Sequence, residues 1–281
     1  MVRHGIITLL IGLLMLTGCS KRPQHFETEV LNGFTPVKNQ GSSQLCWAYA
    51  MLAAIETEHI ERGDSVHLSV AFIDKVIEQL PEAPSSKRAM GITTLNLMQE
   101  YGMVPYDAMP TADMPLPRHA YMMGMEYSPQ EFARSVCAPG EYIALGTNDE
   151  EPFYNEYEPA VPDNWEHNRL YNLPPDSLLA ITEQAVRSHH GVCWEGDTSE
   201  HGFNWAEGVA DTWLWNGSTS DNHCMAIVGI AHDEDGQQYF IMKNSWGTDN
   251  AYSGLMYLSF NYFRIKTIAI YLPKAVMTSG E

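Results

Sequence analysis

Residues 47–55, WAYAMLAAI, are apolar on every side of a helix, and this stretch constrains the fold more than any other. A helix without a polar face has nothing to present to water, so other elements must enclose it. Ser42 or Ser43 can cap its N-terminus, residues 56–62 turn polar, and Gly63 is a typical C-terminal stop. The sequence therefore predicts a central helix whose first half is buried.

Cys46 directly precedes this apolar run and follows a short polar turn. A structural cysteine usually lies inside an apolar run, where it behaves as a small hydrophobe. At the N-terminus of a buried helix, unpaired backbone N–H groups and the helix dipole favour the thiolate over the thiol. We therefore expect Cys46 to be a nucleophile.

A candidate base for this nucleophile comes from a predicted hairpin near the C-terminus. The apolar strand HCMAIVGIA begins at His223, and QYFIMKN runs back to Asn244 after a turn centred near residue 234. In an antiparallel hairpin with that turn, His223 and Asn244 would lie side by side. The asparagine could then hold the imidazole ring toward Cys46.

Composition and the distribution of residue types limit the class and the organisation of the chain. The 281 residues carry 16 basic against 35 acidic side chains, a net charge of −19, which excludes nucleic acid as a partner.

Residues 35–104 are predicted to be mainly helical and residues 191–275 to be strands and turns. The connection at about 105–175 holds eleven of the 16 prolines, so we expect it to be mostly irregular, either a lid or surface padding. A helix is predicted over residues 176–190, with Asp176 as its N-cap.

The N-terminal residues are typical of a targeting signal rather than of a structural element. Arg3 precedes an apolar stretch, Ile6 to Leu16, that is too short to span a membrane and has the length of a signal-peptide core. The following Leu-Thr-Gly-Cys resembles the lipobox of bacterial lipoproteins. That resemblance implies a signal peptide at 1–18, lipidation of Cys19 and a tether at 19–34. We expect a cell-envelope protein on the outer membrane facing the periplasm; a secretory peptide with an incidental cysteine is the alternative.

Four pieces in order resemble the papain family of cysteine peptidases: Gln40-Gly41, Cys46-Trp47-Ala48, a histidine opening an apolar strand, and Lys243-Asn244-Ser245-Trp246-Gly247. The resemblance implies an α+β fold of two lobes, a helical one bearing the nucleophile and an antiparallel β-barrel-like one bearing the histidine, with the cleft between them. It makes Cys46 the nucleophile, His223 the general base and acid, and Asn244 the orienting residue. Gln40 would donate to the oxyanion beside the backbone N–H of Cys46, Trp246 would shield the histidine, and Gly91 would contact the substrate strand.

Other segments resemble the bleomycin hydrolase branch of this family, namely YGMVPYDAMP, GVCWEGD and SGLMYLSFNYFRIKTIAIYL. The resemblance covers roughly residues 35–272 and implies a peptidase domain at 35–281, with the proline-rich region at about 105–175 as an insertion. That branch implies aminopeptidase or small-peptide hydrolase activity in a caged site, often in a ring-shaped homo-oligomer. It also implies a C-terminus that selects free amino ends, a role left open here for Gly280 and Glu281.

Alternatives to this interpretation come from other classes of protein. An endopeptidase of the same family, a catalytically inactive peptide-binding lipoprotein and a murein-acting cysteine amidase all remain open. No cofactor or metal is expected, because His189 and His190 lack partners at ligand spacing. Cys224 is expected to point into the sheet, and whether Cys137 and Cys193 form a disulfide is left open by the odd number of cysteines.

Overall fold

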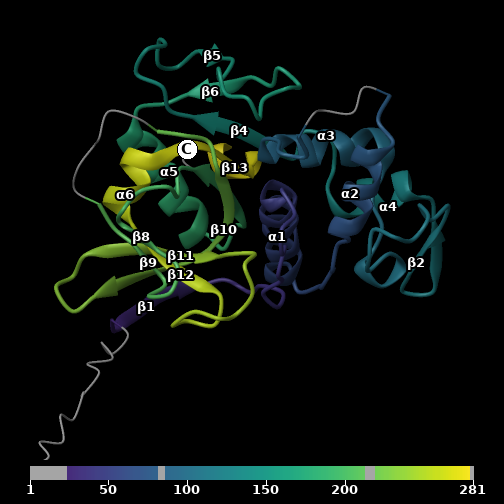
Figure 1. The fold of residues 1–281 in the computed structure, drawn as a ribbon, viewed down its shortest axis with the longest axis horizontal. Helices are drawn as coiled ribbons and strands as arrows, with labels where there is room; N and C mark the ends of the chain where they lie inside the picture. The colour runs from purple at the N-terminus through teal and green to yellow at the C-terminus, as the bar shows by residue number, and fades with distance from the viewer. Residues whose placement is uncertain (1–23, 82–85, 213–218, 279–281) are drawn as a thin grey trace, which may run out of the picture.

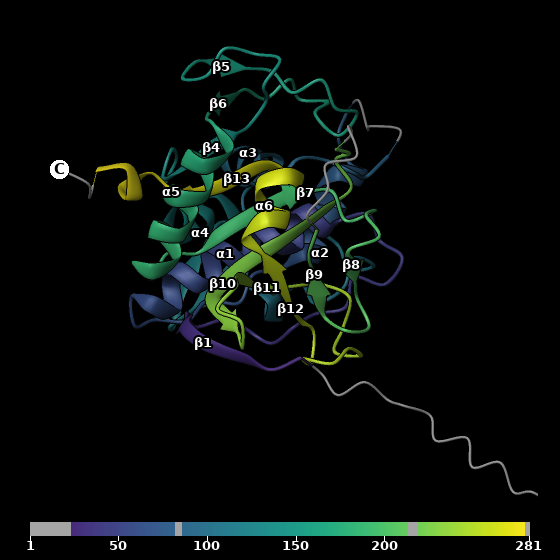
Figure 2. The same ribbon diagram turned by 90° about the vertical axis from the view of Figure 1, so that its left-hand side faces the viewer.

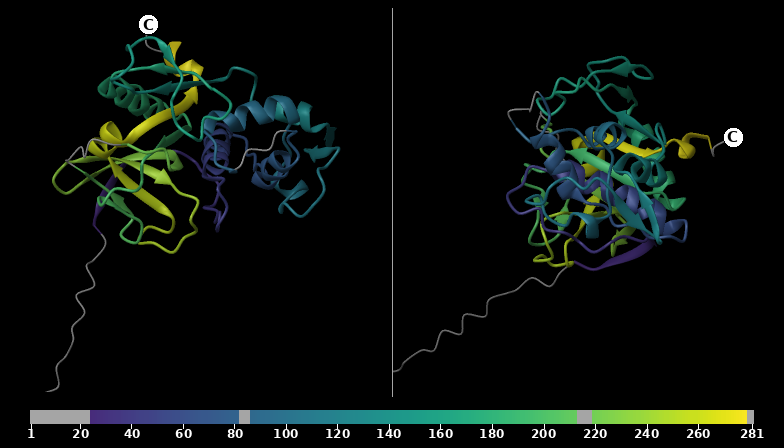
Figure 3. Two further views of the ribbon diagram at one scale, coloured as in Figure 1. Left: turned by 45° about the horizontal axis from the view of Figure 1, so that its top comes forward. Right: turned by 90° about the vertical axis from the view of Figure 1, so that its right-hand side faces the viewer.

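Four helices gather in one half of the structure, a computed structural model that describes residues 24–81, 86–212 and 219–278. Figure 1 shows these helices on the right and most of the strands on the left, with α1 between the two groups, and the left panel of Figure 3 shows the same division. The elements of this half are α1 (Cys46–Glu61), α2 (Val70–Glu78), α3 (Gly91–Tyr101), η1 (Tyr106–Ala108), β2 (Ala120–Met122), β3 (Met125–Tyr127) and α4 (Pro129–Val136).

The other half is built on one large sheet. Its order is β5-β6-β4-β13-β7-β10-β11-β12-β9-β8, and β1 pairs with the far end of β10. The strands are β1 (Phe26–Leu31), β4 (Tyr142–Gly146), β5 (Glu156–Tyr157), β6 (Leu170–Asn172), β7 (Val192–Gly196), β8 (Phe203–Asn204), β9 (Val209–Ala210), β10 (His223–Asp233), β11 (Gln238–Lys243), β12 (Leu255–Ser259) and β13 (Thr267–Pro273). Helices α5 (Pro175–Arg187) and α6 (Phe260–Lys266) and the short η2 (Lys274–Thr278) complete it, and Figure 2 shows η2 projecting near the C-terminus. The sheet is open, so the barrel-like lobe of the expectation is a curved sheet rather than a closed barrel.

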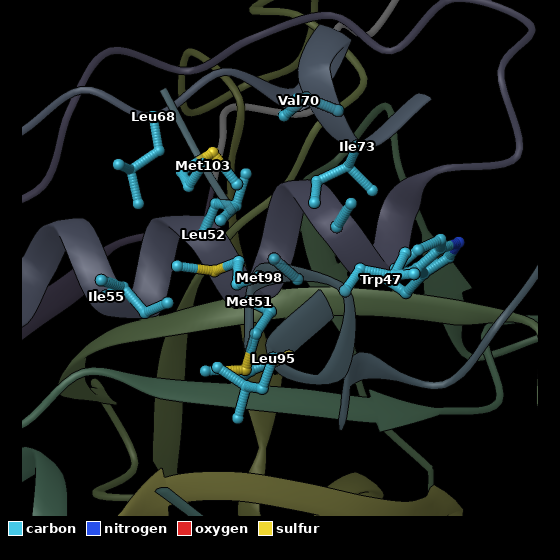
Figure 4. Packing of buried hydrophobic residues seen from close by; sticks show 14 of the residues in the cluster. Trp47, Met51, Leu52, Ile55, Leu68, Val70, Ile73, Leu95, Met98 and Met103 are labelled. Carbon is cyan, nitrogen blue, oxygen red and sulfur yellow. The ribbon is translucent and has the colours of Figure 1, made fainter. Parts of the chain in front are cut away.

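Helix α1 is the centre of the core, which confirms the prediction of a buried central helix. Trp47, Met51 and Leu52 are fully buried and pack with side chains from α2 and α3, as Figure 4 shows. Its polar second half is buried as well, including Glu56 and Glu58, because β7, β10 and the segment before β7 close over it. The burial of α1 therefore extends beyond the first half, which is the part that the sequence predicted to be buried.

The caps of two helices also differ from the predictions. Leu45 is the N-cap of α1 and its side chain makes no capping hydrogen bond, so neither Ser42 nor Ser43 caps the helix. Helix α5 has Pro174 as its N-cap, with Asp176 inside the first turn. Proline is favoured at such a start because its missing N–H would have no partner there.

The connection between the halves is less irregular than its prolines suggest. It contains α4, which begins with a capping box at Ser128 and Glu131, and β4, which pairs with β13 inside the large sheet. Prolines at the first position of a helix and in loops leave room for regular elements between them.

Among the described residues, no helix has the length and apolarity needed to cross a bilayer.

Candidate active site

The predicted hairpin brings His223 and Asn244 together, although its register differs from the prediction. The β10–β11 ladder ends where Ala226 pairs with Lys243, and His223 lies opposite Gly196 of β7 instead. Beyond the ladder the chain bends, and the two side chains meet: His223 Nε2 lies 2.8 Å from Asn244 Oδ1. The contact therefore comes from side chains at the ends of two strands and not from a cross-strand pair.

The orientation of both side chains follows from their other contacts. Asn244 Oδ1 also accepts the backbone N–H of Ser245 at 2.7 Å, and because an amide N–H only donates, this atom is the oxygen. His223 Nε2 must then carry a proton and donate it to Asn244. The other ring nitrogen, Nδ1, is left for proton exchange with a partner. His223 is 3% exposed, so water competes little for this hydrogen bond.

Trp246 lies against the imidazole. The ring centroids of His223 and Trp246 are 4.3 Å apart with 32° between the planes, and Trp246 is itself supported by the edge contacts of Phe203 and Trp205. An indole in this position covers the imidazole and limits the access of water to the His223–Asn244 hydrogen bond.

Gln40 is tied to the segment that carries Asn244. Its backbone N–H donates to Ser245 O at 2.7 Å, and Ser245 Oγ donates to its side-chain Oε1 at 2.6 Å. One N–H of its amide donates to Ser43 O at 2.8 Å, and the amide carries a second N–H. Gln40 and Ser245 are 205 residues apart in sequence. Their hydrogen bonds therefore join two distant segments close to Cys46, which follows Gln40 by six positions.

Cys46 begins α1 and is partly exposed, while the helix behind it is buried. The pKa of its thiol is held well below the usual range. The largest contribution is a hydrogen bond from the Cys224 thiol; burial opposes it, and the hydrogen bond and positive charge of His223 add to it. A thiolate beside an imidazole with a proton to give is a nucleophile and general-acid pair.

A buried carboxylate holds the segments of this site together. Glu56 of α1 is fully buried and accepts hydrogen bonds from the Leu68 backbone N–H at 2.8 Å and from Lys38 Nζ at 3.2 Å. Lys243, directly before Asn244, lies 3.9 Å from the same carboxylate and donates to Thr35 Oγ1 at 2.7 Å. Burial lowers the pKa of Lys243 to about 8. Glu56 therefore links the nucleophile helix to the segments that carry Gln40 and Asn244.

Gly91 does not lie where the resemblance placed it. It is a buried first residue of α3, and a Cβ added to it would come within 2.5 Å of the Tyr271 ring. Its backbone N–H donates to Glu195 Oε2 at 2.9 Å. The expectation that Gly91 contacts the substrate was wrong, because the glycine is needed for close packing of α3 on β13.

Sequence reasoning missed the buried carboxyl pair formed by Glu195 and Asp221. Glu195 accepts hydrogen bonds from Gly91 and from the Tyr271 hydroxyl at 2.5 Å, and it pairs across the sheet with Cys224, the neighbour of His223. Burial raises the pKa of both carboxyl groups, well above the usual range for Asp221, and the negative charge of Glu195 adds to that shift. These raised pKa values favour a proton held between the two carboxyl groups, in agreement with the buried Glu195 Oε1 and Asp221 Oδ2, which have no other hydrogen-bond partner among the described residues. A glutamate in an otherwise apolar strand was the signal that could have revealed it.

This shared proton makes the stability depend on pH. Unfolded carboxyl groups lose their protons above about pH 4, so the folded pair is fully stabilising below that pH and its contribution is lost as pH rises toward the raised folded pKa. In Asp221→Asn the amide supplies the hydrogen at every pH. We expect the free energy of unfolding of this variant, measured with urea between pH 5 and 8, to rise relative to the wild type with increasing pH. Asp176→Asn, at an exposed position, is the control, and parallel curves for the wild type and Asp221→Asn would contradict the shared proton.

The remaining predicted residues are placed as follows. Cys137 and Cys193 are both free thiols, and Cys224 is buried in the sheet as expected. His190 contacts Glu58 at 3.0 Å and His189 contacts Asn32 at 3.0 Å. Within the described part of the chain, no group of three or more His, Cys, Asp or Glu side chains is arranged to hold a metal ion. Cys19 and the signal peptide, as well as Gly280 and Glu281, lie outside the described residues.

The fold and this arrangement of a cysteine, a histidine and an asparagine are papain-like. Residues 158–271 match the family model described as papain family cysteine protease. Among curated proteins, the chain is 25% identical to a viral cathepsin of Adoxophyes honmai nucleopolyhedrovirus over 87% of its length. It is 26% identical to the senescence-specific cysteine protease SAG12 of Arabidopsis thaliana over 79% of its own length. The chain spans 57% and 52% of the lengths of these two relatives.

Solved structures show the same fold. PepW from Lactobacillus rhamnosis superposes with a TM-score of 0.72 at 14% identity, covering 89% of this chain and 82% of PepW. Procathepsin L2 from Tenebrio molitor gives a TM-score of 0.56 at 19% identity, covering 85% of this chain and 64% of that one. At these identities the likeness concerns the fold, and the chemistry rests on the site itself.

Proposed function

We propose that the protein hydrolyses peptide bonds through a Cys46 thiolate and the His223 imidazole. The thiolate adds to the scissile carbonyl, and the side chain of Gln40 and the backbone N–H of Cys46 stabilise the resulting oxyanion. His223 protonates the leaving amine and then takes a proton from the water that hydrolyses the thioester. The observation that carries this proposal is the 2.8 Å His223–Asn244 hydrogen bond beside a helix-terminal thiol of lowered pKa.

We further propose that it acts as an aminopeptidase or small-peptide hydrolase. The inserted region is anchored close to the site: Arg88, three residues before α3, binds Asp163 of the insertion through contacts of 2.6 and 2.9 Å. The same guanidinium donates to the backbone oxygen of Asp221 at 2.6 Å, two residues before His223. Trp165 of the insertion also donates its indole N–H to Arg88 O at 3.1 Å. A fixed insertion on this side of the site favours short substrates or free ends, in line with the bleomycin hydrolase branch that the sequence resembles.

For its location, we propose a lipid anchor at Cys19 in a bacterial cell envelope. The support is the sequence Leu-Thr-Gly-Cys after an apolar stretch of signal-peptide length. Release of the protein from membranes by detergent but not by salt, together with loss of anchoring in Cys19→Ala, is the expected result.

An epoxide inhibitor directed at papain-like enzymes tests the nucleophile and the substrate class together. We expect the adduct, mapped by mass spectrometry, on Cys46. We also expect cleavage of a peptide with a free N-terminus but not of its acetylated form. Equal cleavage of both forms would support an endopeptidase and contradict the aminopeptidase proposal. A folded, reduced protein without an adduct would contradict catalysis and leave a peptide-binding role.

A further inference from the structure

A buried carboxylate outside the residues assigned to catalysis holds the chain that leads into His223. Asp197 directly follows β7 and is 2% exposed. Its Oδ2 accepts the backbone N–H of Ser220 at 3.0 Å, and its Oδ1 accepts an N–H of the Asn222 side chain at 2.8 Å. Asp197 therefore contacts two of the three residues that immediately precede His223.

The side chain of Asn222 is oriented by the groups at both of its ends. Its Oδ1 accepts the backbone N–H of Thr198 at 2.8 Å, which identifies this atom as the oxygen. Its amide nitrogen therefore faces Asp197, which is an acceptor. The backbone N–H of Asn222 donates to Gly196 O at 3.3 Å, and Gly196 is the residue opposite His223 in the sheet. Asn222 is thus bound to the end of β7 through its backbone and its side chain.

The surroundings of Asp197 keep its carboxyl group ionised. Lys266 of α6 is fully buried and lies 3.8 Å from the carboxylate, and Glu200 contacts the same ammonium group. Burial would raise the pKa of Asp197, but hydrogen bonds from Ser199 and from the segment before His223 outweigh it and hold the pKa below the usual range. An ionised carboxylate accepts hydrogen bonds at both oxygens, so it can satisfy all of these donors together.

His223 depends on this support because it is the first residue of β10. The ladder with β7 holds the strand from His223 onward, whereas the residues before it belong to no helix or strand. Asn244 and Trp246 contact the imidazole ring itself. The direction of Nδ1 also depends on the backbone from which the ring extends, so a displacement of Asn222 would move the ring relative to Cys46.

We propose that Asp197 is a positioning residue: by holding Ser220 and Asn222, it keeps the imidazole of His223 directed toward the Cys46 thiol. This inference rests on the proposed function. A ring that turns away withdraws the hydrogen bond and the positive charge of His223, which help to lower the pKa of the Cys46 thiol. The thiolate then forms only at higher pH, and the misdirected imidazole protonates the leaving amine poorly.

Asp197→Asn tests this role, because it replaces one acceptor oxygen with an N–H group that faces other donors. We expect kcat for a susceptible peptide to fall about 10²-fold, with KM near the wild-type value. We also expect the midpoint of the pH dependence of Cys46 alkylation by iodoacetamide, read by mass spectrometry, to rise by about one unit. Alkylation does not require peptidase activity, so it separates failure of this inference from failure of the proposed function.

Asn222→Ala removes one link to His223 and leaves the carboxylate in place, so it remains informative if Asp197→Asn does not fold. It should lower kcat and raise the alkylation midpoint in the same direction. The double variant should be no more impaired than Asp197→Asn alone, because the two side chains act on His223 as one unit.

Asp233→Asn is the matched control. Asp233 lies at the other end of β10, and its Oδ1 accepts the backbone N–H groups of Asp235 and Gln237 at 3.0 and 2.9 Å, so this carboxylate also orders a turn beside the strand. The control should keep the wild-type kcat and alkylation midpoint. Unchanged values in folded Asp197→Asn and Asn222→Ala, a change confined to KM, or equal changes in Asp233→Asn would overturn the proposal.

Discussion

Replacing Cys46 with serine is expected to lower kcat/KM for a susceptible peptide by about 10⁴-fold or more. A hydroxyl is far less acidic than a thiol, so Cys224 and His223, which hold the pKa of this thiol low, cannot produce an alkoxide at the same position. The measurement is the initial rate of cleavage of one fluorogenic peptide at fixed pH, with the variant's folding checked by thermal unfolding.

The matched control is Cys137→Ser. Cys137 is a partly buried free thiol at the end of α4, and burial raises its pKa to about 12, so it is not ionised at neutral pH. This variant should retain wild-type activity. Retention of activity by Cys46→Ser, or its loss only in Cys137→Ser, would show that the nucleophile lies elsewhere.

Replacing Glu56 with leucine is expected to lower the free energy of unfolding by about 3–5 kcal/mol. Among the described residues, Glu56 is the carboxylate that contacts both Lys38 and Lys243, so the substitution leaves two ammonium groups without this counter-charge in a poorly solvated site. It also leaves the buried Leu68 N–H without its acceptor. Urea unfolding followed by tryptophan fluorescence gives the value.

Glu183→Gln is the control for charge removal. Glu183 lies on the surface of α5 and pairs with Arg187 four residues on, an exposed pair worth about 0.3–0.5 kcal/mol. Comparable losses in the two variants would contradict the structural role of Glu56. Because Glu56 links the segments of Gln40 and Asn244, activity should fall in the leucine variant even under conditions where it remains folded.

Local patterns predicted the elements that carry the chemistry. The apolar run after Cys46 is the buried helix α1, and the strand opening at His223 pairs with the strand that ends before Asn244. The exact register could not be predicted, because a bulge between Ile227 and Gly229 shifts the pairing. Gly91 was misplaced because a glycine is compatible with a substrate contact and with close packing alike, and only the position of Tyr271 distinguishes them.

Contacts between residues that are distant in sequence account for the features of the site that the sequence did not predict. Glu195 and Asp221 come together because β7 and β10 are neighbours, and Arg88 reaches Asp163 because the insertion folds back toward α3. The apolar strand around Glu195 indicates a buried carboxyl group but not its partner, and Arg88 and Asp163 are each compatible with an ordinary surface charge.

By itself, the sequence determined the residue types of the site and the helix and strands that present them, because periodicity, turn residues and the position of a cysteine before an apolar run are local properties. Only the tertiary structure decided how the Cys46 thiol is ionised and how His223 is oriented. Those properties depend on burial and on neighbours brought together from about 180 residues away, and electrostatic and hydrogen-bond energies follow distance in space rather than along the chain.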